Sequence, residues 1–476
     1  MRKESDLLGE LLIPEDKYYG VQTLRSLQLN PVSSSRMCDY PGSIQALATL
    51  KKICAQANKN IGALDTVIAD AIMQATNEVI AGKFNDQFEV DMYSGGGGIA
   101  MHMNINEVLA NRANELLTGK KGYDRVHPNT HVNMCQSTND VLPSAMKLTM
   151  YWAVQRTCDS IRILEQAFAA KAKEFEKDVK LARTCLQDAL PITFGQEFSG
   201  YASVIKRQRE RLEHCMQDGW LDLTLGGTAV GTGMGMMPGF FEEVYRLLRE
   251  QTHQDIKPDA NIFDGMQNPD GYLYLSGILK CLAVSLSKIS FDLKMLSSGP
   301  FAGFGEITLP AVQPGSSIMP GKVNPSLPEL IIQIAQQVCG NDLTITMAVE
   351  KGELDLSIAE QILLKTSLDS LSLLEKSLPI FADKCIAGIT INGDKALLDA
   401  QRSPALVTMV SILFGYEAGL AIARKAKEEQ TSIKQAAVDS GIVSPEQAED
   451  LFNVLNLTDR TAMENLLAKY ASIRSV

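Results

Sequence analysis

The stretch QPGSSIMPGKVNPSLPE, residues 313–329, is the most informative part of this chain. Within it, proline and glycine precede a pair of hydroxyl side chains, Ser316 and Ser317, and Lys322 and Asn324 follow at fixed offsets. Ser316 or Ser317 can serve as a nucleophile or a base, and Lys322 with Asn324 can hold a carboxylate. The mixture predicts a mobile polar loop with a chemical role.

A helix is predicted to begin directly after this loop. Ser326 and Glu329 have the spacing of a capping box and stand before an apolar-periodic run. Main-chain N–H groups at a helix N-terminus favour anions, so the loop should lead into an anion-attracting position.

Two other interpretations of the loop explain less of it. A nucleotide P-loop needs four residues between its glycines and a Ser or Thr after the lysine, whereas Gly315 and Gly321 are separated by five residues and Val323 follows Lys322. An ordinary capped turn accounts for Ser326 and Glu329, but leaves the serine pair, the lysine and the asparagine without a reason.

Length, charge and cysteine content narrow the class of protein. The chain has 476 residues, a net charge of −11 and nine scattered cysteines. The acidic balance argues against nucleic-acid binding. No stretch approaches the ~20 consecutive apolar residues of a membrane span, so no membrane partner is expected. An odd number of cysteines without CxxC pairs favours reduced thiols in the cytoplasm. The five histidines lack metal-ligand spacing, so no metal site is expected.

Apolar periodicity predicts a mainly α protein with three domains. We expect an irregular arm with a short hairpin over residues 1–40, inside an N-terminal domain of residues 1–139. A long-helix bundle should occupy 140–393, with a central buried helix over 272–296. A small helical domain should follow over 394–476.

Two further polar segments are candidates for ligand binding. Ser137, Thr138 and Asn139 are three short hydrogen-bonding side chains in a row before a long helix, and they can chelate a carboxylate or simply cap that helix. Thr184 and Gln187 would share one helical face if their segment is helical, with Cys185 between them as a small buried hydrophobe.

Two glycine-rich segments allow close backbone approach. The run Gly95–Gly98 can bring main chain against a ligand or form a flexible loop. The second run, residues 226–233, is interpreted as a close-packed turn, because no strand precedes it and the phosphate-loop register is missing.

These segments together resemble the aspartase/fumarase superfamily over nearly the whole chain. The superfamily signature GSSxMPxKxN is matched at every fixed position by Gly315, Ser316, Ser317, Met319, Pro320, Lys322 and Asn324. Residues 136–140 and 184–198 resemble its two other regions. The segment from Tyr18 to Arg25 is similar to the aspartate ammonia-lyase branch, since fumarases usually carry a tryptophan there.

The resemblance implies an activity and an assembly. Members of this branch release ammonia from L-aspartate to give fumarate through an aci-carboxylate dianion held by preorganised donors. The resemblance implies a three-domain helical fold, a homotetramer whose active sites draw on three subunits, a small dicarboxylate substrate and no organic cofactor.

The resemblance also assigns roles to individual residues. Ser316 would be the general base, and Lys322 with the loop amides would stabilise its oxyanion. The loop would close over the substrate. The binding roles fall on Ser137, Thr138 and Ser317 for the carboxylate that becomes the dianion, on Thr184, Lys322 and Asn324 for the other carboxylate, and on Asn139 for the leaving amine.

Several positions depart from the aspartase pattern. Residues 99–102 read Ile-Ala-Met-His where aspartases have Thr-Ser-x-Asn, and Ile99 cannot bind the amino group as that threonine does. Cys185, Phe301 and Ser357 replace other usual residues. The departures leave two alternatives open: a lyase that removes another group from a substituted succinate by the same proton abstraction, and a non-catalytic family member.

Overall fold

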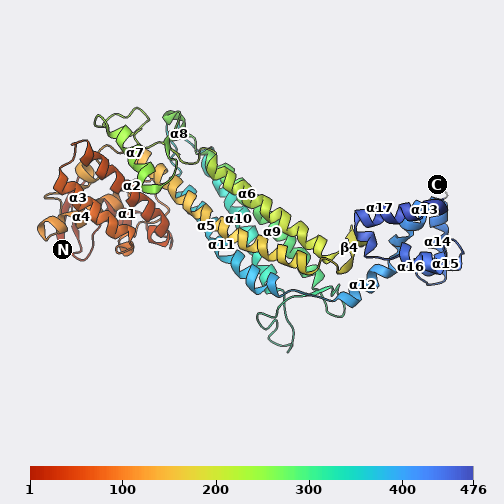
Figure 1. Ribbon diagram of the computed structural model, residues 1–476. Coiled ribbons are helices and arrows are strands. Elements are labelled where there is room, and N and C mark those ends of the chain that lie inside the picture. Colours follow the sequence, from red (N-terminus) through yellow and green to blue (C-terminus); the bar gives the residue numbers. More distant parts are fainter. Residues whose placement is uncertain (475–476) are drawn as a thin grey trace. The chain divides into compact units, whose positions relative to one another are not determined.

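The structure is a computed structural model that describes residues 1–474, and it divides into two compact units. Unit 1 comprises Met1–Asp159, Gln208–Ala283 and Ile334–Glu375. Unit 2 comprises Ser160–Arg207, Val284–Gln333 and the chain from Lys376 onward. Helices dominate both units and the strands are short, which confirms the predicted mainly α class (Figure 1). The division into three domains stays a prediction.

The N-terminal part of unit 1 begins with the predicted hairpin. Strands β1 (Arg2–Asp6) and β2 (Gly9–Ile13) pair antiparallel. A helix that the sequence analysis did not anticipate follows, α1 (Val21–Leu29). Its N-terminus is held by the buried Glu107 carboxylate, which accepts the N–H groups of Gly20, Gln22 and Thr23. A carboxylate at the N-terminus of a helix is attracted by the positive end of the helix dipole and stabilises the helix.

Three helices form the rest of this part: α2 (Pro41–Asn60), α3 (Thr66–Ile80) and α4 (Ile99–Thr118). The predicted apolar face of α2 is buried at Ile44, Leu47 and Leu50. The same face also buries a lysine, Lys51, which is fully enclosed. A buried lysine requires polar partners, and these lie beside the cavity described below.

Long helices contribute segments to unit 1: α5 (Thr138–Glu174), α9 (Asp270–Leu296), α10 (Ser326–Glu350) and α11 (Glu360–Lys384). Ser276 and Lys280 of α9 both donate to Asp342 of α10, at 2.8 and 2.5 Å. Asn341 of α10 donates to Ser370 of α11 at 2.9 Å. These contacts join three helices side by side, as expected of a long-helix bundle. Shorter elements of unit 1 are β5 (Asp222–Leu223), β6 (Lys257–Pro258), α7 (Phe240–Thr252) and α8 (Ile262–Gln267).

In unit 2, α6 (Phe194–Gln217) packs its aromatic side chains on α5, with the Phe168 and Phe198 rings 6.1 Å apart. A hairpin of β3 (Val179–Thr184) and β4 (Gln187–Thr193) precedes it. The interpretation of residues 184–187 as one helical face is therefore wrong. Cys185 and Leu186 form the tip with φ values of 52° and 59°, and Cys185 is exposed instead of buried.

Short helices follow residue 393 in unit 2, as the sequence predicted. Leu406 and Met409 are buried in their shared core, and Val179 and Leu181 of β3 belong to the same core. The elements are β7 (Ile307–Thr308), β8 (Thr390–Ile391), α12 (Gly393–Arg402), α13 (Val407–Phe414), α14 (Tyr416–Glu428), α15 (Ile433–Asp439), α16 (Pro445–Leu451) and α17 (Arg460–Lys469).

Helix α9 corrects one expectation from the sequence. Among residues 1–474 it is the one helix long and apolar enough to cross a membrane by length and composition, although no such stretch was expected. Half of its apolar window is buried inside the protein, which is also the behaviour of a core helix.

Candidate active site

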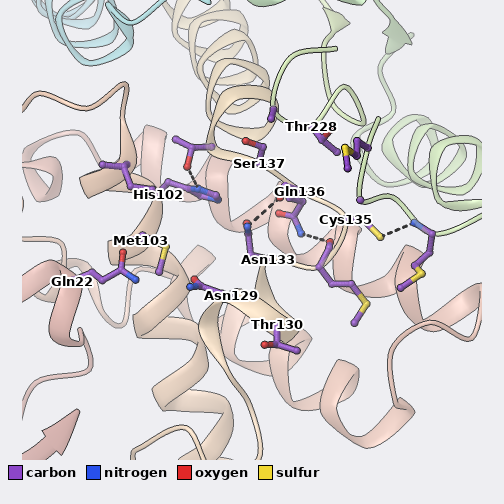
Figure 2. Close-up of a pocket in the computed structure, with 17 residues that line it drawn as sticks. Gln22, His102, Met103, Asn129, Thr130, Asn133, Cys135, Gln136, Ser137 and Thr228 are labelled. Atoms are coloured by element: carbon purple, nitrogen blue, oxygen red, sulfur yellow. Dashed lines mark hydrogen bonds between the residues drawn. The ribbon is translucent and has the colours of Figure 1, made fainter. Parts of the chain in front are cut away.

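A cavity of about 700 Å³ with a mixed polar and apolar lining lies in unit 1, and two of the predicted binding residues, Ser137 and Thr138, line it. Figure 2 shows Ser137 and His102 on its wall, with Asn129, Thr130 and Asn133 from the preceding segment. The lining comes from the first turn of α4, from the π-helical turn Pro128–Val132 and the residues after it, and from residues 228–237. The cavity therefore collects segments that are distant in the sequence.

Helices α4 and α5 both begin at this cavity, and Gly98 allows their first turns to lie against each other. Gly98 precedes α4 with φ 78°, and a Cβ there would stand 2.0 Å from Leu142 of α5. A left-handed backbone conformation and the missing side chain are both required at this position. The first turn of α4 consequently lies against the start of α5, and the positive ends of both helices favour an anion in the cavity.

A buried chain of hydrogen bonds runs from Lys51 to the cavity wall. The Lys51 ammonium lies 2.7 Å from Nε2 of His102, and Nδ1 of His102 lies 2.7 Å from the hydroxyl of Thr138. The ammonium also donates to Oδ1 of Asn133 at 3.0 Å and to Oε1 of Gln136 at 2.8 Å. Burial lowers the pKa of Lys51 to about 7 and lowers the pKa of His102 well below its usual value.

Asp140 fixes the backbone on both sides of the cavity. Its carboxylate is completely buried and accepts the main-chain N–H groups of Ser137 at 2.8 Å, Gly226 at 3.0 Å and Thr228 at 2.9 Å. Burial raises the pKa of Asp140 to about 6. The predicted close-packed turn is confirmed only for residues 226–228, where a Cβ on Gly226 would stand 2.6 Å from the Phe241 ring, whereas Ala229, Val230 and Thr232 are exposed. The expectation that no strand precedes this run is wrong, since β5 ends at Leu223.

Asn139 and Ile99 occupy contrasting positions near the cavity. Asn139 donates its side-chain amide to the carbonyl of Ala229 at 2.8 Å, so this amide N–H is engaged with backbone. Ile99, the residue that replaces the aspartase threonine, lines the cavity with 42% of its surface exposed. The contact predicted between Asn139 and the leaving amine stays a prediction.

The serine loop lies in unit 2 and directs main-chain donors at one serine. The hydroxyl oxygen of Ser316 accepts the N–H groups of Ile318 at 3.3 Å and Met319 at 3.0 Å. Ser317 and Lys322 are exposed, as are the apolar side chains of Ile318 and Met319. Two N–H donors on one hydroxyl oxygen stabilise negative charge on that oxygen.

The neck of the serine loop is closed by direct backbone contact. Gly315 donates its N–H to the carbonyl of Lys322 at 2.8 Å, and the Asn324 side chain donates to the carbonyl of Gly315 at 2.8 Å. Helix α10 begins at Ser326, but the predicted capping box does not form, because the Glu329 N–H donates to the carbonyl of Pro325 at 3.1 Å. The Ser326 hydroxyl accepts from Gln313, and Glu329 pairs with Lys294 at 3.2 Å, so both residues have partners beyond the helix end.

Thr184 is exposed at the end of β3, next to the tip of the hairpin in unit 2. The hairpin is anchored by Glu306, a completely buried carboxylate that pairs with Lys180 at 3.0 Å and Arg183 at 2.5 Å. Lys180 also donates to Glu197 of α6. A buried carboxylate with two cationic partners holds the backbone around Thr184 firmly.

The predicted site residues therefore fall into two groups within one chain. Unit 1 brings Ser137 and Thr138 together at the cavity, and unit 2 holds Thr184 and the serine-loop residues Ser316, Ser317, Lys322 and Asn324. The sequence analysis missed Lys51 and Asp140 as polar anchors of the cavity. A signal for Lys51 was present, since it lies four residues after Leu47 on the apolar face of α2.

Comparison with known protein families gives two matches. The family model described as Lyase matches residues 9–340, and the model described as Fumarase C C-terminus matches residues 406–459. A curated aspartate ammonia-lyase from Bacillus sp is 40% identical over 459 residues, covering 96% of this chain and 97% of the relative. The aspartate ammonia-lyase of Escherichia coli K12 is 38% identical over 459 residues, covering 96% of each chain.

Solved structures with the same fold carry related descriptions. A fumarate lyase:delta crystallin from Brucella melitensis superposes with a TM-score of 0.93 at 39% identity, covering 96% of this chain and 99% of the other. A class II fumarase from Schistosoma mansoni gives a TM-score of 0.92 at 33% identity with the same coverage. The names of these relatives thus include aspartate ammonia-lyases, a fumarate lyase and a fumarase.

Proposed function

Since the chain belongs to the aspartase/fumarase superfamily of lyases, we propose that it is a carbon–nitrogen lyase that eliminates ammonia from L-aspartate to give fumarate. The breadth of the match to curated aspartate ammonia-lyases supports this choice among superfamily activities. The serine-loop signature is complete, which argues against a non-catalytic role.

The observation that carries the proposal is the pair of main-chain donors on Ser316. The proton to be removed lies beside a carboxylate and is very weakly acidic, so a strong base is needed, and the family resemblance assigns this role to an alkoxide of Ser316. The N–H groups of Ile318 and Met319 stabilise that alkoxide on the Ser316 oxygen. The reaction then breaks the C–H bond, places the electron pair in an aci-carboxylate, and expels ammonia as the double bond of fumarate forms.

Binding of the two carboxylates uses both groups of residues. Ser137, Thr138 and Ser317 would hold the carboxylate that gains charge, and Thr184, Lys322 and Asn324 would hold the other. These residues are divided between the two units of the chain. The family resemblance implies a homotetramer in which different subunits complete each site.

Cellular context follows from composition. All nine cysteines are free thiols, which suits a reducing cytoplasm. The proposed partners are a small dicarboxylate and further copies of the chain, without an organic cofactor, nucleic acid or membrane.

A second candidate function rests on Ile99. An apolar side chain exposed to the cavity replaces a hydroxyl that would bind the amino group. The same base and carboxylate site would then remove a different group, an amine derivative, an alcohol or a thiol, from a substituted succinate.

The decisive experiment follows the ultraviolet absorbance of fumarate with purified protein and L-aspartate. We expect fumarate to form, and the Ser316→Ala variant to lose at least about 100-fold in kcat, because a positioned base contributes about that much. Ser326→Ala is the matched control, since its hydroxyl lies in the same segment and is engaged by Gln313.

The remaining outcomes separate the candidate functions. Absence of fumarate from folded tetrameric protein would overturn the ammonia-lyase proposal. A substituted succinate turned over faster than aspartate, in the same Ser316-dependent manner, would establish the second candidate. Unchanged turnover by Ser316→Ala would contradict both.

A further inference from the structure

The hydrogen-bond chain from Lys51 through His102 to Thr138 fixes the direction of every proton along it. The first link is set by two side-chain amides. Asn133 donates its amide N–H to the carbonyl of Gln136, and Gln136 donates its amide N–H groups to the carbonyls of Val132 and Met134. Both amide nitrogens are therefore turned to backbone, and both amide oxygens must face Lys51.

Both amide oxygens can only accept hydrogen bonds, so Lys51 must be the donor to each of them. An ammonium has three N–H donors and no acceptor. Two of them satisfy Asn133 and Gln136, and the third points to Nε2 of His102, which is 2.7 Å away. Nε2 is then the acceptor nitrogen of a neutral imidazole. Burial next to the lysine lowers the pKa of His102 well below its usual value, which keeps the ring neutral.

The tautomer of His102 determines whether the Thr138 hydroxyl accepts a hydrogen bond from the imidazole or donates one to it. With Nε2 as the acceptor, the ring proton is on Nδ1 and is donated to the Thr138 oxygen at 2.7 Å. The hydroxyl proton of Thr138 can no longer point to the histidine. It is left to point into the cavity that Thr138 lines.

We propose that Lys51 and His102 are positioning residues that make Thr138 an obligatory hydrogen-bond donor to a substrate carboxylate in this cavity. This inference rests on the proposed function, since it concerns the carboxylate-binding role given there to Thr138. Neither residue touches the substrate in this scheme. The buried charge of Lys51 adds positive potential behind the hydroxyl, which also favours a dicarboxylate ligand.

The reverse arrangement shows why the lysine charge matters. A neutral Lys51 would carry a lone pair and could accept a proton from Nε2 of His102. Nδ1 would then accept the Thr138 hydroxyl, and Thr138 would turn its lone pairs toward the cavity. A carboxylate would meet an acceptor there in place of a donor, and binding would weaken.

The first test observes the tautomer directly. Magic-angle-spinning 15N NMR of the histidine-labelled tetramer, with His102 assigned by loss of its signal in His102→Asn, should show a neutral ring protonated at Nδ1 at pH 6. In Lys51→Met the ring should change to the Nε2-protonated form. Lys52→Met, on the next residue of α2, is the matched control and should leave the tautomer unchanged. An Nε2-protonated ring in the wild type would overturn the inference, whatever the enzyme does with aspartate.

The second test uses two amides that each imitate one half of the imidazole. In His102→Asn the amide stands near the Nδ1 position and can still donate to Thr138. In His102→Gln it stands near Nε2 and can accept from Lys51 without reaching Thr138. Measured by calorimetry with succinate, His102→Asn should bind at least tenfold more tightly than His102→Gln, and Thr138→Val should match His102→Gln.

Coupling and stability distinguish this role from a purely structural one. The double variant His102→Gln/Thr138→Val should bind succinate no more weakly than Thr138→Val alone, because both changes remove the same donor. Additive losses would contradict the chain, as would equal binding by the Asn and Gln variants. Wild-type protein that neither binds succinate nor acts on aspartate would count against the proposed function, while the tautomer spectrum still decides the inference. Melting curves and tetramer size identify any variant that fails to fold.

Discussion

Asn324 donates its side-chain amide to the carbonyl of Gly315 at 2.8 Å and thereby ties together the two ends of the serine loop. The two strands of the neck lie close because Gly315 has no side chain: a Cβ there would stand 2.6 Å from the main-chain nitrogen of Asn324 and 2.7 Å from the main-chain oxygen of Lys322. The loop that presents Ser316 thus has a closed neck and an exposed tip. Its geometry is defined at the neck, while its tip is free to meet a substrate.

We expect Gly315→Ala to reduce kcat at least about tenfold and to destabilise the protein by about 1–3 kcal/mol, because the added methyl group overpacks the neck against backbone. The added methyl group must push the 322–324 backbone away and displace Ser316 from its donors. Steady-state rates and melting curves check both parts. Gly42→Ala is the control, because its Cβ would meet nothing within 4 Å. Full activity of Gly315→Ala would show that the closed neck is dispensable.

Asp140→Asn should destabilise the fold by about 1–3 kcal/mol, the cost of leaving a buried donor unsatisfied. An asparagine has one oxygen, whereas the Asp140 carboxylate uses both oxygens to accept three N–H groups. Thermal unfolding is the measurement, with the exposed Asp188→Asn as reference. A variant as stable as the wild type would mean that the 226–228 backbone finds other partners.

Glu306→Gln should loosen the hairpin that carries Thr184. Glutamine has no negative charge, so the buried cations Lys180 and Arg183 lose an ion-pair partner. Breaking a buried ion pair lowers the free energy of unfolding by roughly 3 kcal/mol. We expect a lower melting temperature and a raised KM, because Thr184 is proposed to bind a carboxylate. An unchanged KM in a destabilised variant would separate the hairpin from substrate binding.

Ile99→Thr should increase kcat/KM for aspartate by up to about 100-fold if the proposed ammonia-lyase activity is correct, since a hydrogen bond to a charged group contributes about 1.5–3 kcal/mol. The change restores a hydroxyl at a cavity-lining position. Paired assays with aspartate and a less polar substituted succinate measure the switch. Lower activity on aspartate would favour the second candidate function.

Succinate affinity should fall as pH rises above about 7, because Lys51 then loses its proton and the Thr138 hydroxyl reverses. The groups that face Lys51 are His102, Cys54 and Asp140. His102 remains neutral, burial raises the pKa of Cys54 so that it remains a thiol, and Asp140 is ionised above about 6. Calorimetry from pH 6 to 9 should show a falling affinity in the wild type and a weak, pH-independent affinity in Lys51→Met.

Loss of fold stability cannot explain a succinate affinity that falls with pH, because the contribution of Lys51 to stability rises over the same pH range. Burial lowers the pKa of Lys51 from 10.5 to about 7, so the unfolded chain binds more protons than the native one between these values. The cost of burying the charge is present below pH 7 and is relieved as pH rises, which stabilises the fold. A stability that fell between pH 7 and 9 would point to a different group.

Local patterns were sufficient for the long helices, but not for α1, whose N-terminus is held by the distant Glu107. The apolar periodicity of α2 and α9 specifies a buried stripe or core whatever surrounds it. The start of α10 at Ser326 was also predicted, although Ser326 and Glu329 bond to Gln313 and Lys294 and not to each other. The β3–β4 hairpin was missed because Thr184 and Gln187 fit a helical face as well as a turn. Its tip requires positive φ at Cys185 and Leu186, which are not typical turn residues.

The sequence by itself determined the mainly α fold class, because apolar periodicity is a short-range property. Its motifs also selected Ser316, Lys322 and the 137–139 segment as candidates, and their roles stay predictions. Only the tertiary structure decided that Lys51 is buried against His102, that His102 meets Thr138, and that Asp140 ties α5 to the 226–228 turn. These contacts join residues 36 to 88 positions apart. Their protonation states arise from burial, and burial is a property of packed neighbours that no single stretch of sequence records.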